Sequence, residues 1–176
     1  MGRPYLILLP LLSLFLARVD LTDLFPLRFR VKVVEIIDAD TVLVGHGTRR
    51  LKVRLLKLDA PEKGQPFSGG RGDAGAVAKA CATGVIGEGK VFELRVFRLD
   101  IYQRFLGELE DLSLRLVRNG CSGIYPYATF GSKREKGLFL RALSRAKRER
   151  VGLWGSGGYR KPVLWRKASR RSARRR

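Results

Sequence analysis

Residues 29–58 read FRVKVVEIIDADTVLVGHGTRRLKVRLLKL, and this stretch decides the fold. It holds three runs rich in Val, Ile and Leu, over residues 29–37, 41–44 and 49–58. Runs of this kind, bounded by polar or Gly-rich spacers, favour strands. The spacer GHGT tolerates positive φ, so a hairpin fits between the second and third runs. The stretch predicts a β-meander, with His46 as a solvated turn residue.

Downstream of the meander the pattern changes between loop, helix and strand. Residues 61–73 form a loop dense in Gly and polar residues, and residues 74–82, AGAVAKACA, predict a short helix. Residues 91–99 return to strand character. A small β-barrel with helices packed against it is the compact arrangement for this order of elements.

Two more helices are expected towards the C-terminus. The first carries an apolar stripe at i, i+3, i+7 and i+8 and ends at Asn119 and Gly120. That stripe consists of Leu109, Leu112, Leu116 and Val117. The second spans residues 132–150, has a strongly basic outer face, and is expected to bury Leu138, Ala142 and Ala146.

Composition narrows the classes of function. The chain has 176 residues, of which 45% are hydrophobic and 30% charged, so it belongs with globular rather than disordered proteins. The net charge of +20 favours a polyanionic partner, either nucleic acid or an acidic membrane. One histidine excludes a His-rich metal site or an HNH-type nuclease, and two cysteines exclude a four-cysteine zinc site.

The two ends of the chain differ from the middle. Residues 1–17 combine an early Arg3 with an apolar run that is shorter than the roughly 20 residues of a membrane span, which favours export. Phe15 stands where a cleavage site has a small residue, so an uncleaved anchor stays open, while Pro10 disfavours a buried helix. We expect a leader over residues 1–26, a domain over 27–156 and a basic tail, at least partly disordered, over 157–176.

Four acidic residues gather in this basic chain at the ends of the predicted strands, namely Asp38, Asp40, Asp59 and Glu62. In a three-stranded meander the start of the second strand lies beside the end of the third, so these carboxylates converge. Convergence is costly unless a cation or arginines compensate the charge. Carboxylate oxygens form a hard-donor site suited to Ca²⁺ or Mg²⁺. Solvated turn residues paired with lysines are the alternative.

Two arginines add a second kind of group. Arg54 lies in the third run, five residues before Asp59, and Arg104 lies in the segment DIYQRFLG. A guanidinium keeps its charge at any working pH and binds a phosphate through two donors. Beside a metal ion, such arginines neutralise the charge that builds up on phosphorus during displacement.

These residues carry a resemblance to a known family. The pattern DADTVLV, nine residues, RLLKLDAPE over residues 38–62 resembles the first signature of the staphylococcal nuclease (thermonuclease) family. The segment DIYQRFLG, residues 100–107, resembles the second signature. The resemblance extends from about Val33 to Trp154, and both segments occur in the family's order.

The resemblance implies an α+β protein, a five-stranded OB-fold β-barrel with three packed α-helices, that hydrolyses DNA and RNA phosphodiesters with Ca²⁺ and leaves 3′-phosphate ends. It assigns catalytic roles to Arg54, Glu62 and Arg104. Glu62 would orient or deprotonate the attacking water, and Arg54 and Arg104 would hold and stabilise the scissile phosphate. The metal ligands would be Asp40, Asp59 and the backbone carbonyl of Ala60, with Asp38 nearby. Tyr102, Tyr125 and Tyr127 would contact the substrate.

Some positions depart from the family pattern. Ala39 stands where glycine is usual, which matters only if the backbone there needs positive φ. Gln103 stands where glycine is commoner. Ala60 replaces a common threonine, a small loss if the ligand is the carbonyl. Ile101 replaces a lysine or arginine, which removes one exterior phosphate contact. None of these changes removes a chemical group that the reaction needs.

Several alternatives stay open from the sequence. Tyr125 and Tyr127 form an aromatic platform for bases, or one is core and the other packs on Pro126. Cys81 and Cys121 form a disulfide, or are small core residues. The rival functions are a catalytically silent nucleic-acid-binding OB module and a basic protein anchored to a membrane surface. We expect an exported monomer, secreted, periplasmic or anchored by its leader, that uses Ca²⁺ or another hard divalent cation.

Overall fold

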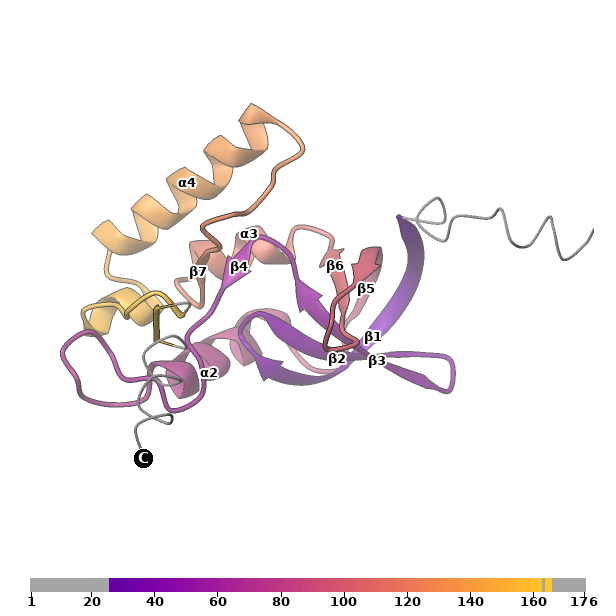
Figure 1. The fold of residues 1–176 in the computed structure, drawn as a ribbon, viewed down its shortest axis with the longest axis horizontal. Helices are drawn as coiled ribbons and strands as arrows, with labels where there is room; N and C mark the ends of the chain where they lie inside the picture. Colours follow the sequence, from indigo (N-terminus) through magenta and orange to yellow (C-terminus); the bar gives the residue numbers. More distant parts are fainter. Residues whose placement is uncertain (1–25, 163, 166–176) are drawn as a thin grey trace, which may run out of the picture.

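Five strands close into a barrel in the computed structural model, which describes residues 26–162, 164 and 165 (Figure 1). Around the barrel the order is β1-β2-β3-β6-β5, and β3 and β6 are parallel whereas the other neighbours are antiparallel. The strands are β1 Leu27–Asp38, β2 Thr41–His46, β3 Arg49–Leu55, β5 Val91–Leu99 and β6 Phe105–Leu109. With the three helices of the described chain, this confirms the predicted OB-fold α+β class.

The meander forms because its alternating residues share one apolar face. Val33 pairs with Val44, and Val42 pairs with Val53, and all four are buried in the barrel. The predicted hairpin is present between β2 and β3, with Gly47 at φ +56°. His46 is exposed but is the last residue of β2, where its Nδ1 lies 2.9 Å from the carbonyl oxygen of Arg30.

The third predicted strand ends earlier than expected. Lys57 adopts φ +69°, which turns the chain out of the barrel after Leu55. The next residues form β4, Leu58–Asp59, in a separate two-stranded sheet with β7, Gly123–Ile124. The turn therefore carries the acidic end of the meander away from the barrel wall and towards the later helices.

The helices are α2 Ala74–Ile86, α3 Leu112–Arg118 and α4 Lys133–Arg148, followed by the 3₁₀ turn η2 Gly152–Ser156. Asp73 caps α2 by accepting from the backbone N–H of Ala76, and Ser132 caps α4 by accepting from that of Glu135, both at 3.0 Å. Small buried residues let α2 approach the barrel closely; they are Ala74, Gly75, Ala78 and Ala82. The predicted helices are present; α2 extends beyond the predicted residues 74–82, whereas α3 and α4 are shorter than predicted.

Two residues of the predicted helix faces lie elsewhere. Leu109 is buried, but it is the last residue of β6 and pairs with Leu94, because Glu110 at φ +46° separates the strand from α3. Leu138 is 41% exposed, and Phe139 takes its place on the buried face with Ala142 and Ala146. The first predicted stripe starts before α3 begins, and the second includes an exposed neighbour of the buried residue. Apolar spacing alone does not fix where a helix begins or which edge of its apolar face is covered.

Lys57 also ties α4 to the barrel. Its Nζ bonds the carboxylates of Glu108 on β6 and Glu135 in the first turn of α4. The same ammonium lies 5.8 Å from the ring centroid of Phe139. A single cation therefore joins β6 and the N-terminus of α4, and it fixes the segment that connects β7 to α4.

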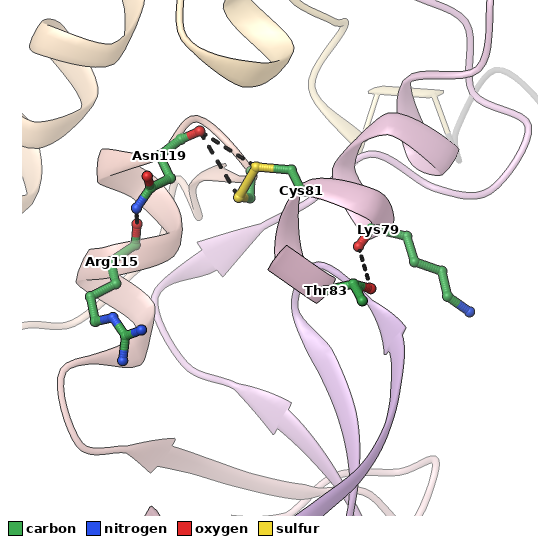
Figure 2. Close-up of a disulfide and its surroundings, with 6 residues drawn as sticks. Lys79, Cys81, Thr83, Arg115 and Asn119 are labelled. Atoms are coloured by element: carbon green, nitrogen blue, oxygen red, sulfur yellow. Dashed lines mark hydrogen bonds between the residues drawn. A yellow bond between two sulfur atoms is a disulfide. The ribbon is translucent and has the colours of Figure 1, made fainter. Parts of the chain in front are cut away.

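The two cysteines form a disulfide, which decides the alternative that the sequence left open. Figure 2 shows that Cys81 comes from α2 and that both sulfur atoms lie near the carbonyl oxygen of Asn119, at 3.5 and 4.0 Å. Cys121 follows the C-terminal end of α3. The bond therefore joins α2 to the segment that leads into β7.

The ends of the chain bear on the predicted domain bounds. The leader lies outside the described residues apart from Pro26, as does most of the predicted tail. Tyr159, which the prediction places in that tail, packs into the domain: its hydroxyl donates to the carbonyl of Asp59 and accepts from the N–H of Gly123, both at 2.8 Å. Within the part of the chain that the structure describes, no helix has the length and apolar content of a membrane span.

Replacing both cysteines with serine should lower the free energy of unfolding by about 4 kcal/mol, because the bond closes a loop with a sequence separation of 40 residues. Urea unfolding with and without a reductant measures this. The reductant should destabilise the parent and leave the Cys81→Ser/Cys121→Ser variant unchanged. A parent insensitive to reductant under unfolding conditions would show that the bond does not form.

Glu135→Gln should destabilise the protein at neutral pH by about 1 kcal/mol. Burial alone would raise the pKa of Glu135, but the bonds from Lys57 and from the N–H of Gly131 outweigh burial and hold that pKa below its ordinary value. A depressed pKa stabilises the fold above the ordinary pKa, and this contribution disappears as the pH falls through the lowered value. The difference between parent and variant should therefore vanish in acid.

Glu149→Gln is the matched control, since Glu149 pairs only with exposed arginines at the far end of α4. Thermal unfolding at a series of pH values should show little difference between this variant and the parent. An equal effect of the two substitutions would mean that the bonds between Lys57 and Glu135 add nothing to the free energy of unfolding beyond what an exposed ion pair adds.

Candidate active site

A cleft of about 740 Å³ opens beside β2, β3 and the turn between β5 and β6. It gathers side chains from both motifs of the sequence and from the segment after β7. The charged and polar residues that line it are Asp38, Asp40, Thr41, Lys52, Arg54, Lys57, Glu62, Arg98, Asp100, Tyr102, Arg104, Tyr125, Tyr127 and Thr129. The structure thus brings together most of the residues that the sequence singled out, although they span 92 positions of the chain between Asp38 and Thr129, inclusive.

Asp40 and Arg54 form an ion pair at the bottom of this cleft. They meet because Thr41 of β2 is the register partner of Arg54 of β3. Asp40 also accepts from the hydroxyl of Thr41 at 3.0 Å and from the backbone N–H of Ala60 at 2.8 Å. Arg54 donates in addition to the carbonyl of Leu58 at 3.1 Å. Both side chains are therefore held in one orientation by the backbone on either side of the β3–β4 turn.

Asp38 lies in the same cleft, close enough to Glu62 for the two charges to interact. Burial raises the pKa of Asp38, and repulsion from Glu62 raises it further, whereas Lys79, Arg54 and Arg104 act in the opposite direction. Burial is the first cause of this shift, and the second, repulsion from Glu62, means that two carboxylates lie close together in a protein of net charge +20. A cation placed between these carboxylates would relieve the repulsion.

Asp59 and Ala60 are in β4 and directly after it, and both are almost fully buried, with 3% and 4% exposure. Neither lines the cleft itself. The bond from the N–H of Ala60 to Asp40 connects this pair to the cleft floor, and the Tyr159 hydroxyl holds the carbonyl of Asp59. The structure therefore places the two residues behind the cleft wall, next to Asp40.

The loop that carries Glu62 is fixed by two residues that sequence reasoning did not find. Gln65 is fully buried; its side chain accepts from the N–H of Glu62 at 3.1 Å, and its own N–H donates back to the carbonyl of Glu62 at 2.9 Å. Gly75, at the start of α2, packs so closely that a Cβ there would lie 2.2 Å from the same carbonyl oxygen. Only glycine permits this approach of helix and loop.

Arg104 is positioned by Asp100, four residues earlier in the turn between β5 and β6. The Asp100 carboxylate accepts from the Nε of Arg104 at 2.8 Å and lies 2.7 Å from its Nη2. Burial acts to raise the pKa of Asp100, but the backbone and side-chain bonds from Arg104 prevail and lower it. Asp100 was present in the quoted motif, and its spacing of four from Arg104 was the clue to this role.

The two glycine replacements behave differently. Ala39 is buried and does not occupy the positive-φ region, so its side chain needs no backbone accommodation. Gln103, in contrast, adopts φ +57°, and its N–H closes the turn by donating to the carbonyl of Asp100 at 3.0 Å. The turn that presents Arg104 therefore has the conformation that glycine would adopt without strain.

The three tyrosines lie on the rim of the cleft. Tyr125 and Tyr127 pack edge to face at 5.6 Å and are 37% and 76% exposed, so neither is a core residue. Tyr102 is also exposed, and the guanidinium of Arg104 lies 5.4 Å from its ring centroid. The N–H of Tyr125 donates to the carbonyl of Lys57 at 2.9 Å, which joins the platform to the β3–β4 turn.

The oxygen atoms of this part of the cleft are the kind of ligand that a hard divalent cation prefers. Asp38, Asp40 and Glu62 supply carboxylate oxygens in one cleft, and the carbonyl of Ala60 is an oxygen donor of the same class. Among residues 26–162, 164 and 165, no group of three or more His, Cys, Asp or Glu side chains is arranged to hold a metal ion by itself.

Comparison with known proteins gives a consistent result. A family model described as Staphylococcal nuclease homologue matches residues 52–156, a range that includes Arg54, Asp59, Glu62 and Arg104. The chain is 31% identical over 155 residues to the micrococcal nuclease of Shigella flexneri, covering 81% of this chain and 83% of that protein. It is 28% identical over 141 residues to an uncharacterized endonuclease of Haemophilus influenzae, covering 77% and 72%. Protein ParB of Escherichia coli is 30% identical over 159 residues, 81% of each chain.

Gly75→Ala should destabilise the fold by about 1–3 kcal/mol, because the new methyl group forces the Glu62 loop and α2 apart. Gly84→Ala is the matched control: it lies in the same helix with open space around the added Cβ, and should stabilise the protein by up to about 1 kcal/mol. Urea unfolding of both variants measures the difference. Equal stabilities would mean that α2 does not press on the Glu62 loop.

Proposed function

The chain belongs to the staphylococcal nuclease family, and from that premise we propose that it is a Ca²⁺-dependent nuclease that hydrolyses DNA and RNA without strong sequence preference and leaves 3′-phosphate ends. Nuclease activity in general is supported by its relatives, among them a micrococcal nuclease and an endonuclease. The metal, the polynucleotides and the product ends are what the proposal adds.

The observation that carries the proposal is the composition of the cleft. Two guanidinium groups, those of Arg54 and Arg104, line the same cavity as the carboxylate of Glu62. A phosphodiester is an anion that needs cationic donors, and its hydrolysis needs a group that accepts a proton from water. One cavity holds both kinds of group, within a chain whose net charge attracts polyanions.

Arg54 and Arg104 bind the scissile phosphate and stabilise the extra negative charge of the transition state. Each is oriented by its own carboxylate, Asp40 for Arg54 and Asp100 for Arg104. Oriented donors lose little conformational freedom when the phosphate arrives, so their stabilisation of the transition state is retained. By analogy with the loss of one oxyanion donor, removing either guanidinium should cost about 3 kcal/mol of transition-state stabilisation.

Glu62 accepts the proton of the attacking water. The oxygen of that water forms the new bond to phosphorus, and the bond between phosphorus and the 5′ oxygen breaks, which leaves a 3′-phosphate and a 5′-hydroxyl that takes its proton from solvent. A carboxylate is a weak base, so its position matters more than its basicity. Gln65 and Gly75 supply that position by fixing the backbone of Glu62.

The proposed ligands of Ca²⁺, or of another hard divalent cation, are Asp40, Asp59 and the carbonyl of Ala60, with Asp38 nearby. A bound cation of this kind adds positive charge beside the phosphate oxygens and favours ionisation of a neighbouring water. The raised pKa of Asp38, caused first by burial and then by Glu62, supports a place for positive charge in this part of the cleft.

Tyr102, Tyr125 and Tyr127 are proposed to stack on bases next to the scissile bond, since their exposed rings lie on the cleft rim. We further propose that the protein acts as an exported monomer, secreted or periplasmic, or held at a membrane by an uncleaved leader. The segment that would direct export, residues 1–26, lies outside the described residues apart from Pro26.

Purified protein should degrade single-stranded DNA and RNA in Ca²⁺ and stop when EGTA removes the ion. Glu62→Gln should lower kcat at least about 100-fold while leaving the dissociation constant for single-stranded DNA nearly unchanged, because it removes the proton acceptor but none of the cationic groups. Gel assays with end-group analysis of the fragments measure rate and product ends.

Glu88→Gln is the control, since Glu88 is an exposed carboxylate in the turn before β5, outside the cleft. It should cut at the parent rate. Tight DNA binding by the parent without chelator-sensitive degradation would instead identify a catalytically silent OB module. Cutting by Glu62→Gln at the parent rate would remove Glu62 from its role as base.

A further inference from the structure

A row of basic side chains leaves the cleft along the outer face of β3. Arg50, Lys52 and Arg54 occupy alternate positions of this strand, while Val53 and Leu55 between and after them are buried in the barrel. Alternate residues of a strand point to the same face, with Cα atoms about 7 Å apart. Arg54 and Lys52 both line the cleft, and Arg50 is the next residue outward on the same line.

The row continues onto β1. Gly45 of β2 is the register partner of both Arg50 on β3 and Lys32 on β1, so the two basic side chains stand on one face with a glycine between them. Their Cα atoms are then about 10 Å apart, two strand spacings. Residue 45 has no side chain of its own, and only Cγ2 of Val34 comes within 3.4 Å of the place where its Cβ would lie. We refer to Arg54, Lys52, Arg50 and Lys32 as the basic track.

The outer members of the basic track are available to a ligand. Lys32, Arg50 and Lys52 are exposed, and within the described range none of these three forms an ion pair, in contrast to Arg28, Arg54, Arg95 and Arg104. Exposed cations that are not neutralised by neighbouring carboxylates keep their full attraction for phosphates.

The basic track has defined limits. Beyond Lys32 the outer face of β1 meets Glu93 of β5, which is the register partner of Arg30 and pairs with Arg28 at 3.5 Å. On the other side, Glu35 shares the face with Lys52, separated from it by Leu43. Carboxylates therefore border the basic track at two points, while Arg49 and Arg98, which are exposed and form no ion pair among the described residues, add positive charge close to it.

We propose that the basic track binds successive phosphates of a single polynucleotide strand as the strand leaves the cleft. The proposal rests on the proposed nuclease function, because that function supplies the strand in the cleft. A row of cations that continues from a phosphate site suits one polyanionic chain, because successive phosphates of that chain can contact successive basic side chains. Contacts of this kind read charge and not sequence, so they extend the footprint without adding base preference.

The test compares two pairs of substitutions that remove the same charge. Lys32→Gln/Arg50→Gln removes the outer part of the basic track. Arg118→Gln/Arg150→Gln removes two exposed arginines, the last residue of α3 and a residue two positions after the end of α4; Figure 1 shows both helices apart from the β2–β3 hairpin. Each pair is also made together with Glu62→Gln, so that binding is measured without cleavage.

The measurement is the dissociation constant for an oligothymidylate of roughly 20 nucleotides, longer than the stretch that one OB-fold covers, between about 50 and 200 mM salt. Losing two phosphate contacts on a single strand should reduce the slope of log affinity against log salt by about 1.4. We expect the basic-track pair to show this change and to bind roughly tenfold more weakly, with less than half of either effect for the α3/α4 pair.

Catalysis gives a second readout. In the protein that keeps Glu62, the substitutions Lys32→Gln/Arg50→Gln should raise the KM for the long oligothymidylate more than the KM for a dinucleotide. A dinucleotide does not reach beyond the cleft. Equal effects of the two charge pairs on salt slope would show that only overall charge matters and would overturn the proposal. A basic-track pair that loses binding to phosphatidylserine vesicles but not to the oligothymidylate would overturn it in favour of a lipid surface.

The outcome is separable from that of the proposed function. A parent that fails to cut in Ca²⁺ but shows the salt-slope difference between the two pairs would refute the nuclease and support the basic track. A parent that cuts and shows no such difference would support the nuclease and refute the basic track.

Discussion

The ion pair between Asp40 and Arg54 is the contact on which the arrangement of the cleft depends. It joins the start of β2 to the end of β3, and through the N–H of Ala60 and the carbonyl of Leu58 it also holds the chain that follows β3. A mostly buried pair is stable only when further hydrogen bonds satisfy both partners, and here backbone groups and the Thr41 hydroxyl do so. The pair therefore places a cation and a carboxylate in one fixed geometry.

Around that pair the molecule combines two opposing electrostatic features. The surface carries a large excess of Lys and Arg, whereas the cleft concentrates carboxylates whose mutual repulsion, together with burial, raises the pKa of Asp38. A polyanion is attracted to the surface, and hard cations are attracted to the acidic part of the cleft. The proposed function requires both preferences, because it needs a site that binds a phosphodiester beside a divalent ion.

Long-range contacts that join distant segments give the cleft its rigidity. Lys57 connects β6 and α4 through two carboxylates, and the disulfide connects α2 to the segment before β7. Gly75 lets α2 press against the carbonyl of Glu62, and Gln65 holds the same residue from within the loop. These contacts hold the segments around the cleft. The orientation of its polar groups therefore depends on how the helices pack.

The sequence by itself determined the strands of the meander, the hairpin at Gly47, the identity of the family and most of the residues that meet in the cleft, because alternation, turn chemistry and motif spacing are local properties. It also predicted Asp59 and Ala60 there, which the structure places behind the cleft wall. It did not determine that Leu109 ends a strand, that Phe139 replaces Leu138 in the core, or that Cys81 bonds Cys121. Nor did it reveal Lys57, Gln65 or Gly75 as the residues that hold the cleft. Those features depend on the parallel pairing of β3 with β6 and on how closely α2 and α4 approach the barrel, and only closure of the whole chain decides such distances.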